Sequence, residues 1–243
     1  MTAQLNARGD VAVVVPAAGA GLRLGPGAPK ALRLLEGEPL LVHAVRRLAA
    51  APSVRMIVVA APRADVAAVQ ALLAPVASVT VVAGGAERQE SVAAALAVVP
   101  DEVPIVLVHD AARCLTPPSV TERVAAAVRG GADAVIPVLP VVDTIKEVSA
   151  DDVVLGTVDR SVLRAVQTPQ GFRAAVLRAA HEAAADSHTD DAGAVEKLGI
   201  PVRCVPGSDL ALKITRPLDL ALATHLLAMP DPETPPARPG PLV

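Results

Sequence analysis

Aromatic side chains are almost missing from this chain of 243 residues, which contains no Trp, no Tyr and a single Phe, Phe172. The hydrophobic core must therefore be built from Val, Leu, Ile and Ala. An aromatic platform for nucleic acid is disfavoured, because that mode of binding stacks successive bases on several rings. A nucleobase would have to be recognised mainly by backbone groups and small side chains, with Phe172 as the only ring available for stacking.

An excess of charge of one sign is missing as well. The 22 Lys and Arg residues nearly balance the 25 Asp and Glu residues, and the formal net charge is −3. No overall field attracts nucleic acid or an anionic membrane, and neither is expected as a partner. Lysine itself is rare and occurs only at Lys30, Lys146, Lys197 and Lys213. A lysine in a loop rich in glycine and proline is therefore a candidate functional residue.

Cysteines and long apolar runs are also scarce. Cys114 and Cys204 are the only cysteines, which is typical of a reduced protein and not of a cysteine metal cluster. The apolar run 11–15 is too short to cross a membrane. It follows Asp10 and lacks a clear basic region before it, so it does not resemble a secretory signal. The expected location is the cytoplasm.

Short segments rich in Val and Ile alternate with helical segments rich in Ala and Leu. The predicted strands are Val11–Val15, Arg55–Ala60, Val79–Val82, Ile105–Val108, Ala134–Val138 and Val202–Val205. The predicted helices are Pro39–Ala50, Ala64–Leu73, Glu87–Val98, Pro117–Arg129, Arg173–Ala184 and Pro217–Leu227. Strict alternation predicts an α/β fold with a single Rossmann-like, mostly parallel sheet and helices on both faces. Ligands bind beyond the carboxyl ends of such strands, where segments 16–30, 84–91 and 109–113 are expected to converge.

The segment 140–159 interrupts this alternation. Residues 141–148 and 153–158 are predicted as two strands around a turn at Ala150–Asp152. A hairpin at this place would protrude as an arm, and its exposed Val and Ile side chains indicate a homodimer formed through it. The alternative is a hairpin folded back on its own domain. Residues 1–229 are expected to form one domain, and the proline-rich tail 230–243 a disordered end.

A glycine-rich loop between Pro16 and Lys30 carries the strongest functional signal. Glycines allow backbone N–H groups to approach phosphates, and Arg23 and Lys30 add cations for a polyphosphate. A Walker loop is excluded because no Gly-Lys pair is followed by Ser or Thr. The spacing G-x-G-x-x-x-G and the prolines at 26 and 29 also differ from the dinucleotide fingerprint. The loop predicts a nucleoside triphosphate site, and a plain strand-to-helix turn is the alternative.

A second cluster, Val108-His-Asp-Ala-Ala-Arg113, follows a predicted buried strand. Asp110 at the carboxyl end of this strand is suited to bind Mg²⁺ beside a triphosphate. The alternative for Asp110 is a helix or turn cap. Arg113 could bind a second anion or lie on the surface, and His109 is expected to pack without a catalytic role.

Eight motifs occur in a fixed order: Pro16-Ala-Ala-Gly-x-Gly-x-Arg23, Pro29-Lys30, Gly84-Gly-x-Glu-Arg-x-x-Ser91, Val108-His-Asp-Ala-Ala-Arg113, Thr157-Val-Asp-Arg160, Thr168-Pro-Gln170, Thr189-Asp190 and Lys213-Ile-Thr-Arg-Pro217. Together they resemble the 2-C-methyl-D-erythritol 4-phosphate cytidylyltransferases of the non-mevalonate isoprenoid pathway. The resemblance covers roughly residues 11–228, and the joint order makes it specific although each motif alone is weak.

The resemblance implies a nucleotidyltransferase. A phosphate oxygen of methylerythritol phosphate attacks the α-phosphorus of CTP, and pyrophosphate leaves. Both reactants are anions, so positioning and charge stabilisation carry such a transfer. The implied catalytic cations are Arg23, Lys30, Lys213 and Arg160. The implied cofactor is Mg²⁺ or another divalent cation, with Asp110 as its ligand.

The resemblance also implies two sets of binding residues. Nucleotide binding falls to Pro16, Ala17, Ala18, Gly19, Gly21, Gly85, Arg88 and Ser91. Acceptor binding falls to Asp110, Arg113, Thr144, Arg160, Thr168 and Thr189. Thr144 and Arg160 lie on or beside the arm and would reach the acceptor site of the neighbouring subunit, which gives the homodimer a functional reason.

Structural alternatives stay open for several of these residues. Thr189 is suited to cap a helix, Thr168 to form a turn and Ser91 to occupy a first helical turn. Arg88 could lie on an exposed helix face, Arg160 could pair only locally, and Lys213 could be an edge charge after the strand-like segment 210–212. The chain departs from the family at Leu22, Ala31, Ala86 and Ala211. These departures concern ribose and metal contacts, not the catalytic cations.

Other functions share part of this pattern. A cytidylyltransferase for another alditol phosphate, such as ribitol 5-phosphate, would keep the CTP loop and differ in its acceptor pocket. A nucleotide-binding regulator without catalysis is disfavoured, because the chain retains the candidate cations together with Asp110. A nicotinamide dehydrogenase is disfavoured by the spacing and the prolines of the loop.

Overall fold

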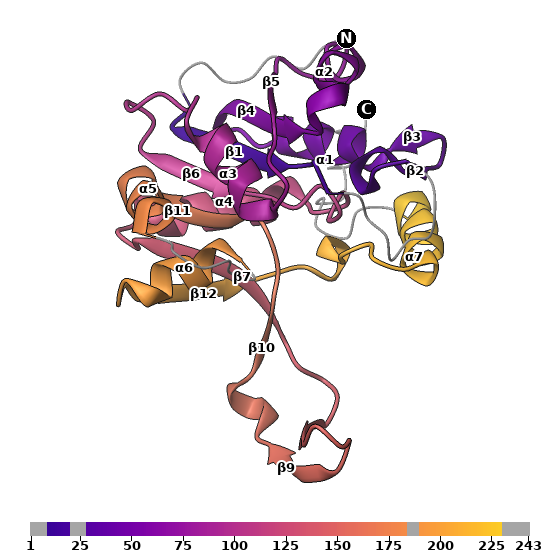
Figure 1. Cartoon of the computed structure of the whole chain (residues 1–243), viewed down its shortest axis with the longest axis vertical. Helices are drawn as coiled ribbons and strands as arrows, with labels where there is room; N and C mark the ends of the chain where they lie inside the picture. Colours follow the sequence, from indigo (N-terminus) through magenta and orange to yellow (C-terminus); the bar gives the residue numbers. More distant parts are fainter. Residues whose placement is uncertain (1–8, 20–27, 184–189, 230–243) are drawn as a thin grey trace, which may run out of the picture.

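The computed structural model describes residues 9–19, 28–183 and 190–229. Its helices are α1 (Leu40–Ala49), α2 (Val66–Leu73), α3 (Arg88–Leu96), α4 (Pro118–Arg129), α5 (Ala174–Ala183), α6 (Asp191–Lys197) and α7 (Pro217–Ala228) (Figure 1). Its strands are β1 (Val11–Pro16), β2 (Leu34–Leu35), β3 (Glu38–Pro39), β4 (Val54–Ala61), β5 (Thr80–Ala83), β6 (Ile105–Val108), β7 (Ala134–Pro140), β8 (Ile145–Val148), β9 (Val154–Val158), β10 (Arg164–Val166), β11 (Gln170–Arg173) and β12 (Val202–Pro206). Gly21, Arg23, Thr189 and the tail 230–243 lie outside the described residues.

Eight strands form the main sheet in the order β10-β7-β11-β6-β1-β4-β5, with β12 paired to β7. The strands β6, β1, β4 and β5 are parallel neighbours, and β12 is parallel to β7. In contrast, β11 runs antiparallel between β6 and β7, and β10 is antiparallel to β7. The predicted mostly parallel α/β sheet is confirmed. The strict alternation was wrong, because the chain adds β10 and β11 before it returns to β12.

The two faces of the sheet are covered by separate sets of helices. Along β1, Val11, Val13 and Val15 pack with residues of α1, α2 and α4. The alternate residues Ala12 and Val14 pack with residues of α3, α5 and α6. All five of these side chains are fully buried. A strand buried on both faces is apolar throughout, which is why the unbroken run 11–15 predicted a buried strand correctly.

The only Phe of the chain, which has no Tyr or Trp, belongs to one of these cores. Phe172 in β11 is fully buried in the core beneath α3, α5 and α6. It is therefore unavailable to stack on a nucleobase. Its neighbour Gly171 lies so close to α4 that an added Cβ would meet Val124 Cγ1 at 2.5 Å.

Local structure differs from the prediction at two places beside the sheet. Between Lys30 and α1, where no helix or strand was predicted, the chain forms a 3₁₀ turn at Lys30–Leu32 and a small hairpin of β2 and β3. The segment expected to be strand-like before Lys213 is a 3₁₀ turn, Asp209–Ala211, so that lysine is not a strand-edge charge. Both segments adjoin a third core that includes Leu35, Leu40 and Ile214 and lies under α7.

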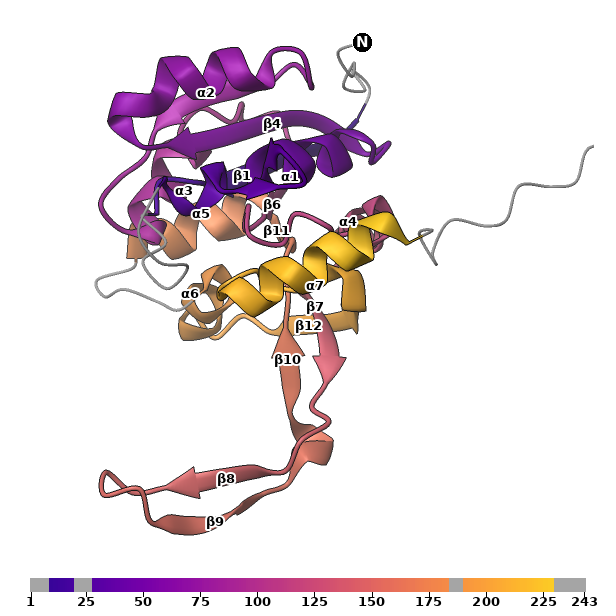
Figure 2. The same cartoon turned by 90° about the vertical axis from the view of Figure 1, so that its right-hand side faces the viewer.

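The predicted arm is present. The strands β8 and β9 pair antiparallel and extend far from the main sheet (Figures 1 and 2). The alternative of a hairpin folded back on its own domain is thus wrong. Several apolar side chains near the arm are exposed, including Val142 (76%) and Leu155 (62%). Within the described ranges, no helix has the length and apolar character needed to span a membrane.

Candidate active site

A cavity of about 280 Å³ opens where β1 and β6 end. These two strands are neighbours, whereas the chain leaves β1 toward β4, so the cavity lies at the point where the strand order reverses. Its lining residues are Pro16, Ala17, Ala18, Gly19, Lys30, Ala31, Gly85, Ala86, Glu87, Arg88, Ser91, Asp110, Ala111, Ala112 and Lys213. All three predicted segments therefore converge, and Lys213 joins them from a distant part of the chain.

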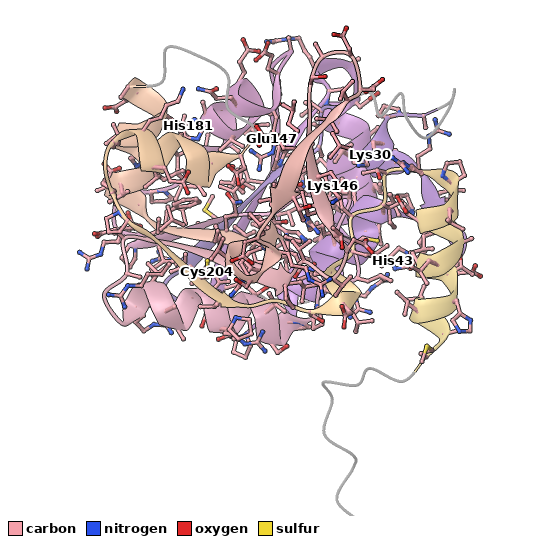
Figure 3. All side chains as sticks on the ribbon, turned by 90° about the horizontal axis from the view of Figure 1, so that it is seen from below. Lys30, His43, Lys146, Glu147, His181 and Cys204 are labelled. Atoms are coloured by element: carbon pink, nitrogen blue, oxygen red, sulfur yellow. The ribbon has the colours of Figure 1, made fainter. Side chains whose placement is uncertain are left out.

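The loop that carries Lys30 is closed by the backbone at its base. The N–H of Lys30 donates to the carbonyl of Gly19 at 3.2 Å, and the N–H of Ala17 donates to Ala60 at 2.8 Å. The first bond returns the chain to the end of β1, which brings Lys30 to the cavity. Lys30 lies beside the violet N-terminal part of the ribbon (Figure 3).

The wall formed by residues 84–91 is shaped by the start of α3. The carboxylate of Glu90 accepts the N–H groups of Ala86 (2.7 Å) and Glu87 (3.2 Å). The Ser91 hydroxyl accepts the N–H of Gly85 at 3.2 Å and donates to the carbonyl of Glu87. A Cβ at Gly85 would meet Glu90 Cβ at 2.3 Å, so glycine is required for this close turn. Ser91 is thus both a first-turn residue and the support of the cavity wall.

Asp110 is the electrostatic centre of the cavity. Its Oδ2 atom lies 2.6 Å from Lys213 Nζ, and its Oδ1 atom lies 3.3 Å from Arg88 Nε. Burial by itself raises the pKa of Asp110, but the charges of Arg88 and Lys213 outweigh it and hold the pKa far below the usual range. The carboxylate is therefore ionised at physiological pH. Its two oxygens pair with Lys213 and Arg88, and among the described residues no backbone N–H donates to them, so Asp110 is not a cap of a turn or helix.

Lys213 reaches Asp110 because its segment is tied to the residues after β6. The N–H of Ile214 donates to the carbonyl of Ala112 at 2.9 Å. Arg113 donates from Nη1 to the carbonyl of Ala211 at 2.7 Å and from Nη2 to that of Val166 at 2.9 Å. In this structure Arg113 thus holds the lysine segment in place and does not lie free on the surface.

Thr168 and His109 form a buried hydrogen-bonded group next to Asp110. The Thr168 hydroxyl accepts the backbone N–H of Asp110 at 3.0 Å and lies 3.1 Å from His109 Nδ1. His109 is buried, and this burial lowers its pKa from 6.5 to about 4, so the ring is neutral at pH 7. The expectation that His109 packs inside the protein is confirmed.

Arg88 connects the cavity to a carboxylate that sequence analysis did not single out. Its Nη1 atom donates to Asp191 Oδ2 at 2.7 Å, while Nε points to Asp110. Arg88 is therefore not the exposed face of α3. Asp191 directly follows the Thr189-Asp190 motif, so the family motifs pointed to this segment although not to Asp191 itself. Asp190 is the N-cap of α6, where its side chain accepts the N–H of Gly193.

The remaining predicted residues lie elsewhere. Thr144 and Arg160 are exposed and lie at the arm, away from the cavity. Arg160 donates to the carbonyl of Val142 and, with Arg164, lines a wide hollow of about 520 Å³ at the neck of the arm. The chain by itself does not bring Arg160 to Lys30 and Lys213.

The donor set of the cavity fits a divalent cation shared with phosphates. Among the described residues, no group of three or more His, Cys, Asp or Glu side chains could hold a metal alone. Of the described residues that line the cavity, two carry carboxylates, Asp110 and Glu87. Mg²⁺ is commonly held by one or two carboxylates together with substrate phosphates and water. The residues present therefore fit Mg²⁺ only if a polyphosphate supplies the other ligands.

The fold and this cavity define a nucleotide-binding α/β enzyme of the nucleotidyltransferase class. The sequence model of the 2-C-methyl-D-erythritol 4-phosphate cytidylyltransferase family matches residues 11–229. The chain belongs to this family, as its eight motifs indicated.

Named relatives agree with this assignment. A 2-C-methyl-D-erythritol 4-phosphate cytidylyltransferase from Frankia casuarinae is 57% identical over 222 residues, which are 91% of this chain and 83% of the relative. The protein of that name from Saccharopolyspora erythraea is 58% identical over 224 residues, which are 90% of this chain and 100% of the relative. The crystal structure of the Thermus thermophilus enzyme is 36% identical, with a TM-score of 0.73 over 88% of this chain and 97% of that chain.

Proposed function

We propose that the cavity catalyses cytidylyl transfer from CTP to 2-C-methyl-D-erythritol 4-phosphate, with release of pyrophosphate and formation of 4-diphosphocytidyl-2-C-methyl-D-erythritol. Membership of the family supports this reaction over the ribitol 5-phosphate and regulator alternatives. The observation that carries the proposal is the meeting of Lys30, Lys213, Arg88 and Asp110 in one cavity at the end of β1. Two phosphorylated anions can approach each other only where such cations reduce their repulsion.

The lysines have the central electrostatic role in this proposal. Lys30 reaches the cavity from the loop and Lys213 from the segment after the 3₁₀ turn Asp209–Ala211, so a triphosphate in the cavity meets positive charge from two separate parts of the chain. Asp110 holds Lys213 in place before the substrate arrives. The family also assigns Arg23 to the charged transition state; this residue lies outside the described part of the chain.

CTP recognition rests on backbone groups. Ala17, Ala18 and Gly85 line the cavity and have little side chain to obstruct a base or ribose. Ser91 orders the turn at Gly85. Since Phe172 is buried in the core, the base must be recognised by hydrogen bonds, as the lack of aromatic residues suggested.

Mg²⁺, or another divalent cation, is the proposed cofactor. Asp110 would hold it together with phosphate oxygens of the nucleotide, and Glu87 lines the same cavity. When bound, the ion would neutralise charge on the triphosphate and so assist the departure of pyrophosphate. Asp110 has to divide its oxygens between this ion, Lys213 and Arg88.

The acceptor site is proposed to need two subunits. Arg113, Thr168 and Thr189 would contribute from one subunit, and Thr144 and Arg160 from the arm of its partner. The support is geometric, because Arg160 lies at the arm, outside the cavity of its own chain. A homodimer formed through the exposed arm would supply the missing contacts. The cytoplasmic location also stays a prediction.

A substrate panel tests the reaction. The protein is incubated with Mg²⁺, one of CTP, UTP, GTP or ATP, and either methylerythritol phosphate or ribitol 5-phosphate, and pyrophosphate is followed. We expect release with CTP and methylerythritol phosphate only. Release with ribitol 5-phosphate would establish the other acceptor. Binding of CTP without turnover would establish a regulator.

A further inference from the structure

A line of ionisable side chains runs from the cavity into the interior between the helices. Lys213 pairs with Asp110 at 2.6 Å, Asp110 with Arg88 at 3.3 Å, and Arg88 with Asp191 at 2.7 Å. His181 Nε2 lies 3.0 Å from the other oxygen of Asp191. Because a carboxylate only accepts, the Nε2 atom of His181 is the donor in this pair. The last two members line no part of the cavity and have no role in the proposed reaction.

Asp191 is much less exposed than an aspartate usually is. Its side chain is 2% exposed and that of His181 is 8% exposed, whereas the Arg88 side chain is 29% exposed. Burial of Asp191 raises its pKa, but the hydrogen bond from His181 and the charge of Arg88 outweigh burial, and its pKa is lowered overall. A buried carboxylate is retained only when its partners compensate its loss of water. The pairing with Arg88 is therefore a fixed part of the fold.

The backbone that carries Asp191 is fixed as well. Its neighbour Asp190 caps α6 by accepting the N–H of Gly193 at 3.0 Å. The Gln170 side chain in β11 donates to Asp190 at 2.7 Å and accepts the N–H of Ala192 at 3.1 Å. Asp191 is thus held by a strand, by the start of a helix and by His181. His181 belongs to α5 and is labelled in Figure 3.

Two carboxylates, those of Asp110 and Asp191, bind the guanidinium of Arg88. Its Nε and Nη1 atoms face Asp110 and Asp191, and among the described residues no hydrogen bond uses its Nη2 atom. This orientation presents the guanidinium to the cavity. Without the charge of Asp191, Arg88 would have only Asp110 as a carboxylate partner and would compete with Lys213 for it.

We propose that Asp191 is a positioning residue for nucleotide binding, and that His181 orients its carboxylate. Asp191 holds the guanidinium of Arg88 at the cavity wall and leaves Asp110 available to Lys213 and to the nucleotide complex. This inference rests on the proposed function of the cavity. Asp191 touches no substrate and acts only through Arg88.

The first test replaces Asp191 by Asn, which keeps the shape and removes the charge. We expect the Kd and the KM for CTP to rise about tenfold, with kcat within about threefold of the original value and a cooperative thermal transition preserved. The matched control is Asp133→Asn, because Asp133 pairs with Arg173 at 3.2 Å on the surface. This control should leave both constants unchanged.

A merely structural role gives a different result. In that case Asp191→Asn lowers Tm and the fraction of active molecules, but the folded protein binds CTP with unchanged Kd, and the proposal is overturned. If Asp191→Asn does not fold, His181→Ala and His181→Gln replace it. The alanine variant should raise the KM for CTP about threefold, and the glutamine variant, which keeps an N–H donor, should restore it. Equal constants for both would also overturn the proposal.

A double-mutant cycle with Arg88→Lys identifies the route of the effect. Lysine lacks the planar fork that binds two carboxylates, so Arg88→Lys alone should weaken CTP binding. If Asp191 acts through Arg88, adding Asp191→Asn to this variant changes the Kd by less than twofold. If the two substitutions instead raise the Kd for CTP by independent factors that multiply in the double variant, the inference is refuted. An original protein that fails to bind CTP would instead refute the proposed function itself.

Discussion

Asp110 and its two cationic neighbours, Lys213 and Arg88, form the network of ion pairs in the cavity. A carboxylate this buried is tolerated only with partners, and Lys213 and Arg88 provide them at 2.6 and 3.3 Å. The same pairs keep two flexible cations in defined positions before substrate binds. Both cations are therefore already ordered in the folded protein, and the reaction does not have to supply the free energy of ordering them.

Lys30→Ala should remove most turnover with little effect on folding. Loss of one preorganised charge of this kind commonly lowers kcat about 100- to 1000-fold, because the transition state carries more charge to stabilise than the ground state. Steady-state kinetics and thermal unfolding measure the two effects. Lys197→Ala, at an exposed lysine on α6, is the control and should behave like the original protein. A nearly unchanged kcat for Lys30→Ala would remove the role assigned to this lysine.

His109 should make the protein less stable as the pH falls. Its pKa is about 4 in the folded protein and 6.5 without the fold, so the unfolded chain binds the proton first. The stabilisation is complete above pH 6.5 and is lost as the pH falls toward 4. At about 1.4 kcal/mol per pKa unit, the loss approaches roughly 3 kcal/mol.

Urea unfolding of His109→Asn and the original protein at pH 7.5 and pH 5 measures this contribution. We expect a smaller difference in unfolding free energy between the two pH values for the variant. His225→Asn, at an exposed histidine on α7, should retain the original difference. An unaltered pH difference in His109→Asn would show that His109 is not the group responsible.

Among the strands, β11 shows best why some elements were predicted and others were not. The apolar runs in β1, β4 and β6 indicate buried parallel strands without further information. In contrast, the four residues of β11 are Gln-Gly-Phe-Arg, with a polar side chain at each end, and β10 has only three residues. These short, partly polar segments become strands because they pair with the edges of β6 and β7. Such pairing partners cannot be predicted from the periodicity of the local sequence.

Gly171→Ala should destabilise the packing between β11 and α4. The added Cβ would lie 2.5 Å from Val124 Cγ1 and 2.8 Å from Leu107 Cδ2, and overpacking of a core typically costs about 1–3 kcal/mol. Urea unfolding gives the change in free energy. Gly156→Ala in β9 is the control, since nothing lies within 4 Å of its added Cβ. Equal stability of both variants would mean that α4 moves away from β11 at no cost.

The complete protein is proposed to work as a dimer through its arm. An arm that extends from the main sheet and exposes Val and Leu side chains gains stability when a partner covers them. Arg160 lies at the neck of this arm, so the same association would bring a cation to the partner's cavity. Stability and activity would then both depend on protein concentration.

Leu155→Glu tests this assembly. Leu155 in β9 is 62% exposed, and a charge at this position should prevent its burial against a partner. Sedimentation should show a dimer for the original protein and a monomer for the variant, whose turnover should also fall. Leu218→Glu, at a side chain 77% exposed on α7, should remain dimeric. A monomeric original protein with full activity would contradict the two-subunit acceptor site.

Local sequence was sufficient for the central strands, most of the helices, the arm and the convergence of three loops at one edge of the sheet. These features follow from apolar periodicity, from glycine and proline positions and from the geometry of parallel strands. The ion pairs of the cavity followed only from the tertiary structure, because Arg88 meets Asp191 across 103 positions of sequence. The local sequence around a charged side chain does not identify its partner. The core shared by α3, α5 and α6 brings Arg88 and Asp191 together, and their burial makes the pairing necessary.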